Sequence, residues 1–328
     1  MFKYFGFSFL LLLVLFANAQ PIDYTFSFKG IGDNREYFSG YNQPQTILGA
    51  RGALILGTRI DSIHRVKAGI DYFFEFGGEL GELKPDFVLY YEAIKGPWMF
   101  RMGSFPRADV LNFPLAIVAD DYTYYKPNLE GLFVQYKGKN WQMNTFADWV
   151  SRQDSVRREQ FMAGFTGRSQ WRRFFVEDYW YMFHNAGTMI RDSNRPIEDY
   201  NGGLIMTGID LSGIIPIDKV IIKTGLLNSM KRIRTPGSKY TISYSSYTEI
   251  QLEYKGYGVQ TIFNFGDPHN FFLGDSFYNN TNSYIRSNIY FTPINFEHVK
   301  GRFTWSLHIA NGDLDNQQQF SLIYLFNR

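Results

Sequence analysis

The stretch RVKAGIDYFFEF at residues 65–76 carries the pattern that decides the fold, because apolar and polar side chains alternate along it. The apolar set shares one face of an extended chain: Val66, Ala68, Ile70, Tyr72, Phe74 and Phe76. The opposite face carries the charged side chains: Arg65, Lys67, Asp71 and Glu75. A period of two residues is typical of a β-strand whose faces meet different surroundings. The stretch therefore predicts a strand with one apolar and one polar face.

The same alternation recurs as far as the C-terminus. It is clear in five further segments: residues 48–60, 248–254, 257–265, 303–309 and 320–326. Alternating segments of about ten residues are the signature of strands that cross a membrane as a barrel. Counting from Tyr24 gives about sixteen strands. Fourteen or eighteen remain open, because residues 172–184 do not alternate cleanly.

The composition favours such strands over membrane-spanning helices. Hydrophobic residues make up 45% of the 328 residues and aromatic residues 19%, yet the mean hydropathy is −0.24. Alternating residues average out in any hydropathy window and still give one continuous apolar face. Beyond the N-terminus no run approaches the ~20 apolar residues that a spanning helix needs. The absence of cysteine excludes disulfides, cysteine-ligated metal sites and a lipoprotein anchor. A net charge of +2 is too small to indicate the strongly basic surface that binds nucleic acid.

The N-terminus has the features of an export signal. Lys3 precedes an apolar core at residues 5–16, and Ala17, Asn18 and Ala19 form the small-x-small pattern that a signal peptidase cleaves. A core of only about a dozen residues disfavours a membrane anchor. We therefore expect a signal peptide at residues 1–19 and the exported domain at residues 20–328.

The connections between the expected strands alternate between long and short. The long ones are residues 30–44, 77–85, 106–128, 185–199, 229–238 and 266–282. The short ones include residues 61–63, 95–96, 138–140 and 255–256. Outer-membrane barrels have short periplasmic turns and long external loops, whereas a soluble barrel has no reason to gather its long loops at one rim. The sequence predicts an all-β fold, a transmembrane antiparallel up-and-down β-barrel of about sixteen strands in the cell outer membrane.

By this pattern residues 20–328 resemble the porins of Gram-negative outer membranes. The stretch WMFRMGSFP at residues 98–106 looks like the porin strand that ends in a Gly-x-aromatic-Pro element before the long third loop. KPNLEG at residues 126–131 then re-enters the barrel, and FADW at residues 146–149 closes the next hairpin. The C-terminus departs from the porin pattern, since Asn327 and Arg328 follow the last aromatic residue. The resemblance implies a channel for passive diffusion of small polar solutes, with the third external loop folded inward.

The third loop supplies the acids of the expected pore constriction, Asp120 and Asp121. Basic residues at the inward-facing positions of the second, third and fifth expected strands would face these acids across the lumen: Arg51, Arg59, Arg65, Lys67 and Arg101. Three loop tyrosines are available to stack on sugar rings: Tyr122, Tyr124 and Tyr125. Charged side chains arranged around a pore, together with its diameter, determine which solutes permeate. The prediction is therefore a constriction with a weak anion preference. The alternative is that these charges solvate a wide lumen or form structural ion pairs.

Other functions find less support in the sequence. Ser306 and His308 share one face of a strand, but that spacing alone is weak evidence for catalysis, and no two histidines have ligand spacing. We expect no enzyme activity, no metal and no cofactor. The alternative function is a non-transporting barrel subunit, a scaffold in an outer-membrane protein assembly. The expected partners are outer-membrane lipid, small polar solutes and either copies of this chain or an outer-membrane complex, and not nucleic acid.

Overall fold

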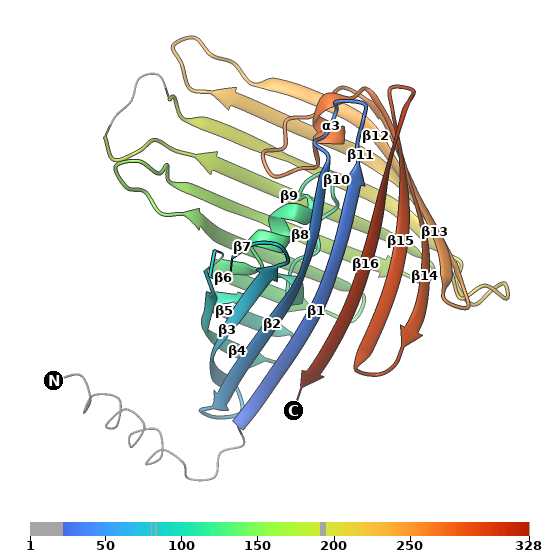
Figure 1. The fold of residues 1–328 in the computed structure, drawn as a ribbon. Coiled ribbons are helices and arrows are strands. Elements are labelled where there is room, and N and C mark those ends of the chain that lie inside the picture. Colours follow the sequence, from blue (N-terminus) through green and yellow to red (C-terminus); the bar gives the residue numbers. More distant parts are fainter. Residues whose placement is uncertain (1–21, 80, 83, 191–194, 328) are drawn as a thin grey trace.

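The computed structural model describes residues 22–79, 81–82, 84–190 and 195–327. These described residues form sixteen antiparallel strands that close into one barrel, in which sequence neighbours pair and the first strand pairs with the last (Figure 1). The first eight strands are β1 (Ile22–Glu36), β2 (Gln45–Arg59), β3 (His64–Glu75), β4 (Asp86–Lys95), β5 (Trp98–Pro106), β6 (Asn128–Lys137), β7 (Trp141–Ser151) and β8 (Gln160–Trp171). The others are β9 (Phe174–Asn185), β10 (Glu198–Asp210), β11 (Lys219–Ile233), β12 (Thr241–Tyr254), β13 (Tyr257–Gly266), β14 (Ser283–Asn295), β15 (Val299–Ala310) and β16 (Asp313–Asn327).

The predicted all-β up-and-down barrel of sixteen strands is confirmed. The predicted signal peptide at residues 1–19 lies outside the described residues. Among the described residues, three short helices occur in the connections: the 3-10 helix η1 (Arg107–Asp109), α2 (Asp120–Tyr125) and α3 (Ser276–Asn280). In the part of the chain that the structure describes, no helix is long and apolar enough to cross a membrane.

Apart from the short turn at residues 311–312 and the longer connection at residues 211–218, long connections lie at one end of the barrel and tight turns at the other. One end, called the loop end below, carries the connections at residues 37–44, 76–85, 107–127, 152–159, 186–197, 234–240 and 267–282. The other end, called the turn end, carries tight turns such as those at residues 96–97, 172–173 and 255–256. This asymmetry is the arrangement that outer-membrane barrels require.

Burial alternates along the strands as the sequence pattern indicates. In β2, Ala53 and Ile55 are buried, whereas Leu54 and Leu56 are exposed on the outer face. In β3, Asp71 is buried on the inner face while Ile70 is exposed. Exposed aliphatic and aromatic side chains on the outer face are what a barrel presents to lipid.

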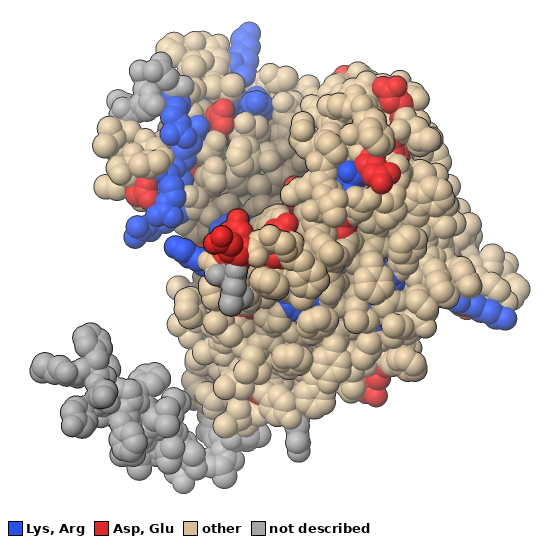
Figure 2. Space-filling model, in the orientation of Figure 1, with Lys and Arg blue, Asp and Glu red and all other residues tan. Residues whose placement is uncertain are grey.

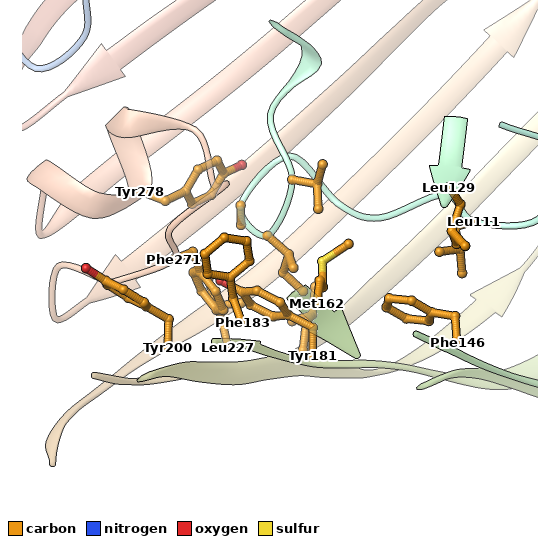
Figure 3. Packing of buried hydrophobic residues seen from close by; sticks show 14 of the residues in the cluster. Leu111, Leu129, Phe146, Met162, Tyr181, Phe183, Tyr200, Leu227, Phe271 and Tyr278 are labelled. Carbon is orange, nitrogen blue, oxygen red and sulfur yellow. The ribbon is translucent and has the colours of Figure 1, made fainter. Parts of the chain in front are cut away.

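Two of the long connections fold into the interior of the barrel, namely residues 107–127 and 267–282. Backbone hydrogen bonds join them, from Ala119 N to Leu273 O at 2.8 Å and from Asp275 N to Leu115 O at 3.0 Å. Their apolar side chains pack with inward-facing residues of the wall in one continuous cluster (Figure 3). Members of this cluster with no exposed surface include Ala116, Ile117, Phe133, Met162, Phe183 and Phe277. The two connections therefore form an apolar plug, by which we mean residues 110–118 and 271–278.

Residues 172–184, whose facing the sequence left open, form a tight turn and most of β9. Arg172 has φ of 55°, which lets the chain reverse there. Phe175 and Phe183 point inward and are buried, while Phe174 and Val176 are exposed outward. Both faces of β9 carry large apolar side chains, and each also carries one acid, Glu177 inside and Asp178 outside, so the alternation is hidden in the sequence.

Candidate functional site

Helix α2 lies inside the barrel against β1, β2 and β3. The ring of Tyr124 is buried among apolar side chains of these strands: Ile31, Ile47 and Phe73. Arg51 of β2 donates a hydrogen bond to the Tyr124 carbonyl oxygen, and Tyr125 donates one to Glu75 of β3 at 3.0 Å. These contacts hold the helix at the wall and leave the acids of its first turn directed away from β2 and β3.

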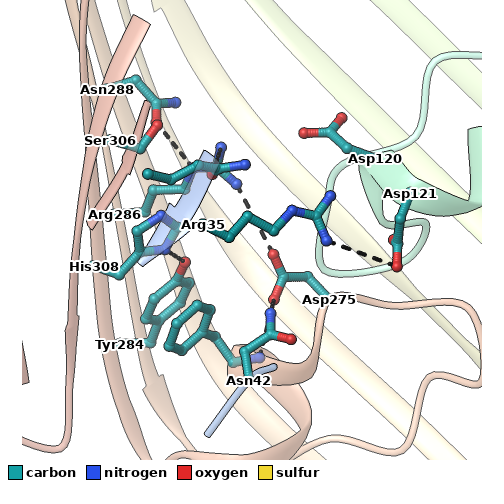
Figure 4. A network of polar contacts seen from close by, with 12 residues as sticks. Arg35, Asn42, Asp120, Asp121, Asp275, Tyr284, Arg286, Asn288, Ser306 and His308 are labelled. Atoms are coloured by element: carbon teal, nitrogen blue, oxygen red, sulfur yellow. Dashed lines mark hydrogen bonds and ion pairs between the residues drawn. The ribbon is translucent and has the colours of Figure 1, made fainter. Parts of the chain in front are cut away.

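The two acids of α2 face basic and amide groups of other strands. Arg35 Nη1 of β1 lies 3.8 Å from Asp121 Oδ2 (Figure 4). The same guanidinium is held in place by Asp33, with Arg35 Nη2 2.9 Å from Asp33 Oδ2. Gln319 Nε2 of β16 donates to Asp120 Oδ2 at 3.4 Å. Among the described residues, Arg35 is therefore the basic residue that forms an ion pair with an acid of α2.

A second basic group, Arg286 of β14, lies in the same region and is almost fully buried. It donates from Nε to Asn288 Oδ1 at 2.9 Å and from Nη2 to Gln317 at 3.4 Å. Its Nη1 atom lies 3.9 Å from Asp275 Oδ2 of the plug, and Asn42 donates to the other oxygen of that carboxylate at 3.1 Å (Figure 4). Burial raises the pKa of Asp275, because removal from water disfavours the carboxylate.

These groups surround a cavity of about 380 Å³ between α2, the plug and the wall at β1, β14 and β16. Its charged lining consists of Arg35, Asp120, Asp121, Lys126, Asp275 and Arg286. The molecular surface is hollowed between the rim loops, with lysine and arginine side chains gathered along one side (Figure 2). Inside the barrel, then, basic and acidic groups face one another across a polar space.

The other predicted basic residues lie on the inner faces of their strands but pair elsewhere. Arg51 Nε lies 3.5 Å from Asp71, so this side chain links the wall to α2. Arg59, which is half exposed, pairs at 3.1 Å with Asp23 near the turn end.

Arg65, Lys67 and Arg101 converge on one carboxylate, Glu92 of β4. Their nitrogen atoms lie 3.5, 3.9 and 2.8 Å from its oxygens. Arg101 also lies 3.3 Å from Asp109 of the third loop. The structure brings these three residues together in a basic cluster, and it does not pair them with Asp120 or Asp121.

The three loop tyrosines differ in their surroundings. Tyr122 and Tyr125 line the cavity, and the guanidinium of Arg107 lies 5.1 Å from the Tyr122 ring centre. Tyr124 is buried at the wall, where Lys29 Nζ lies 5.4 Å from its ring centre. Stacking of sugar rings on these side chains stays a prediction.

Sequence reasoning missed Arg35, Asp275 and Arg286. Arg35 fell in an expected loop at residues 30–44, although β1 continues to Glu36. The alternation of Ile31, Asp33 and Arg35 with small or polar residues was the signal that could have extended the strand. No local sequence pattern marks Asp275 or Arg286 as a site residue. The two side chains come together only because the loop at residues 267–282 folds into the barrel.

A histidine of the loop at residues 267–282 contacts two serine hydroxyls, the pairing of groups that ester cleavage uses. His269 of the plug-bearing loop lies between Ser229 Oγ, 3.0 Å from Nδ1, and Ser245 Oγ, 2.7 Å from Nε2. All three are buried, and burial lowers the pKa of His269 to about 4. Ser306, in contrast, donates to Asn288, and His308 contacts the Tyr284 hydroxyl. Among the described residues no group of three His, Asp or Glu side chains is placed to hold a metal ion.

Solved outer-membrane porins share this fold. The structure is similar to OmpT of Vibrio cholerae lacking loop L8, with a TM-score of 0.58, 8% identity, and coverage of 94% of this chain and 100% of that one. OprB of Pseudomonas putida gives a TM-score of 0.57 and 10% identity, over 98% and 97% of the two chains. OmpF of Salmonella typhi, solved with daunomycin, gives 0.56 and 11%, over 94% and 98%. The resemblance to porins is confirmed at the level of the fold.

Comparisons by sequence point to a family with a different description. No curated protein matches the chain. The family model described as "Lipid A 3'-O-deacylase-type" matches residues 17–327, which is nearly the whole sequence. The chain therefore belongs to the lipid A 3'-O-deacylase-type family, and its barrel has the fold of the porins.

Proposed function

We propose that the protein is a porin-like channel of the outer membrane through which small polar solutes diffuse passively. The proposed route passes the place where the third external loop, residues 107–127, narrows the lumen, and it carries a weak anion preference. The observation that supports this proposal most directly is the charged cavity of about 380 Å³ between α2 and the wall.

The charge arrangement in this cavity suits a selective passage. Arg35, Lys126 and Arg286 line it together with three carboxylates. Facing charges orient polar solutes, and the width of the passage limits their size. Three basic groups face three carboxylates, and burial raises the pKa of one of these, Asp275, so we expect no more than a weak preference for anions.

The plug limits what can pass. A sixteen-stranded barrel with an empty lumen would hold a wide aqueous channel, but here two loops fill part of the interior with apolar side chains. We therefore expect a low conductance and exclusion of solutes larger than small sugars.

Planar-bilayer recordings test the proposed passage with the double variant Asp120→Asn/Asp121→Asn. Removal of two negative charges opposite Arg35 should increase the preference for chloride over potassium, measured as the reversal potential in a salt gradient. Asp23→Asn is the matched control, because Asp23 pairs with Arg59 near the turn end and does not line the cavity. Unchanged selectivity and conductance in the double variant would refute the assignment.

A non-transporting scaffold subunit is the second candidate, and the extent of the plug favours it. Liposome swelling separates the two functions. Vesicles that contain the protein should swell in arabinose or glycine if it is a channel, whereas a scaffold with a closed interior leaves the rate equal to that of empty vesicles.

Deacylation of lipid A is the third candidate, because the family carries that name. Ester cleavage needs a nucleophile or an activated water beside a base. Ser229 Oγ and His269 Nδ1 are 3.0 Å apart, but both side chains are buried. Mass spectrometry of lipid A after incubation with the purified protein is the test. Intact 3'-O-linked acyl chains agree with the channel proposal, and a loss that Ser229→Ala abolishes would assign the enzyme instead.

A further inference from the structure

A groove of about 540 Å³ runs along the outer wall across β7 to β11, on the side of the sheet away from the cavity. Most of its lining is apolar: Trp141, Met143, Phe165, Val176, Trp180 and Ile205. These residues occupy the outward positions of their strands, and several are exposed. The groove is therefore open to the lipid that surrounds the barrel.

Two glycines make the groove possible. A Cβ atom at Gly167 would lie 2.4 Å from Asp178 Oδ1, and one at Gly203 would lie 2.2 Å from the Tyr179 carbonyl oxygen and 2.8 Å from the Trp180 ring. Any side chain at these positions would displace its neighbour. The carboxylate of Asp178 thus lies against the backbone of Gly167, and the indole of Trp180 lies against that of Gly203. The missing side chains at the two glycines leave the groove in the outer wall.

Asp178 is a carboxylate on the outward face of β9, and it lines this groove. Within the described chain no hydrogen-bond donor and no cation pairs with it. Arg168, the nearby cation, is engaged on the inner side, where it pairs with Glu177 and stacks on Phe175 with 4.1 Å to the ring centre. An unpaired charge that faces lipid is costly and is usually matched by a partner.

The depth of Asp178 shows which end of a lipid can reach it. Trp141 pairs with Ser169, and Ser169 pairs with Val176, two residues before Asp178. Two residues correspond to about 7 Å along a strand. Trp141 and Tyr136, stacked with ring centres 4.5 Å apart, belong to the aromatic residues near the turn end. Such residues mark the headgroup level, so the carboxylate lies just inside it.

We propose that this groove binds a phospholipid with a primary ammonium headgroup, taken from the leaflet at the turn end. The ammonium group pairs with Asp178, and an acyl chain lies along Phe165, Trp180 and Ile205. A primary ammonium has N–H donors for the carboxylate, whereas a quaternary ammonium has none. The site therefore distinguishes the two headgroups even when the acyl chains are identical.

Native mass spectrometry of the protein released from mixed lipid nanodiscs tests this proposal. The probes are phosphatidylethanolamine and phosphatidylcholine with the same acyl chains at equal amounts. We expect the wild-type protein to retain the ethanolamine lipid about tenfold more than the choline lipid. Asp178→Asn, which keeps the shape and removes the charge, should retain the two lipids equally. Gly167→Ala, which displaces the carboxylate, should reduce the preference.

Glu130→Gln is the matched control, because Glu130 is an exposed acid on the outer face of β6 away from the groove. It should leave the preference unchanged. Equal retention of both lipids by the wild-type protein would overturn the proposal without any variant, even if Asp178→Asn fails to fold. A preference that survives in folded Asp178→Asn, or that is lost equally in Glu130→Gln, would overturn it as well. Channel activity plays no part in the readout.

Discussion

The two sides of the barrel interior differ in chemistry although the same alternating pattern builds both. The inward residues of β6 to β10 include a cluster of large apolar side chains, among them Phe133, Phe146, Met162, Tyr181 and Phe183. Along β1, β14 and β16 they are largely polar, and they include Asp33, Arg35, Arg286, Asp315 and Gln317. The plug packs on the first side, and the charged cavity lies at the second. Alternation therefore determines which residues point inward, while their polarity determines where a loop can settle.

The apolar side should be the more sensitive to loss of packing. Phe183 is fully buried on β9 and stacks on Phe272 of the plug with ring centres 4.4 Å apart. Phe183→Ala should lower the free energy of unfolding by about 3–5 kcal/mol, since it leaves a cavity in the core. Urea unfolding in detergent measures this loss, and bilayer recordings should show a larger or noisier conductance.

Phe174→Ala provides the comparison on the same strand, because Phe174 is 55% exposed on the outer face. Its effect on conductance should be absent. If the two variants behaved alike, the plug would not be held by the apolar side.

Acid should loosen the loop that carries His269. Burial lowers the pKa of His269 to about 4, so its neutral form is favoured in the folded state. The resulting stability is fully present above the usual histidine pKa of about 6.5 and is lost as the pH falls from there through about 4. Nearby Asp267 partly opposes this shift. The loss is on the order of 3 kcal/mol.

His269→Gln should remove this part of the pH dependence, because glutamine does not titrate. Unfolding measured from pH 8 to pH 4 makes the comparison. A wild-type curve that stays flat, or one that the variant reproduces, would show that His269 does not hold the loop.

The polar side should respond in selectivity more than in stability. Arg35→Gln removes the cation that faces Asp121 and should shift the channel toward cations, by a change of up to roughly fivefold in the permeability ratio for about 1 kcal/mol of local potential. Arg59→Gln, at an exposed pair worth about 0–1 kcal/mol, should change neither property. Reversal potentials of both variants test this contrast, which would fail if Arg59→Gln had the larger effect.

Much of the barrel could be predicted from alternation, because a strand needs only a period of two and a face that meets lipid. β9 was the exception, since Phe175 and Phe183 inside match Phe174 and Val176 outside in polarity. The site was predicted less well. The sequence indicated an inward loop with Asp120 and Asp121, but it gave no sign that the loop at residues 267–282 would also fold inward. That second loop brings Asp275 to Arg286, a contact that no local pattern encodes.

The chain has no cysteine, so a single introduced thiol can report whether solutes pass the cavity. Ser276 lines the cavity, whereas Ser155 lies exposed in the connection between β7 and β8. A methanethiosulfonate reagent added to Ser276→Cys in a planar bilayer should reduce the conductance stepwise, and the same reagent on Ser155→Cys should not. Full conductance after complete modification of Ser276→Cys would contradict the claim that the cavity beside the plug is the passage.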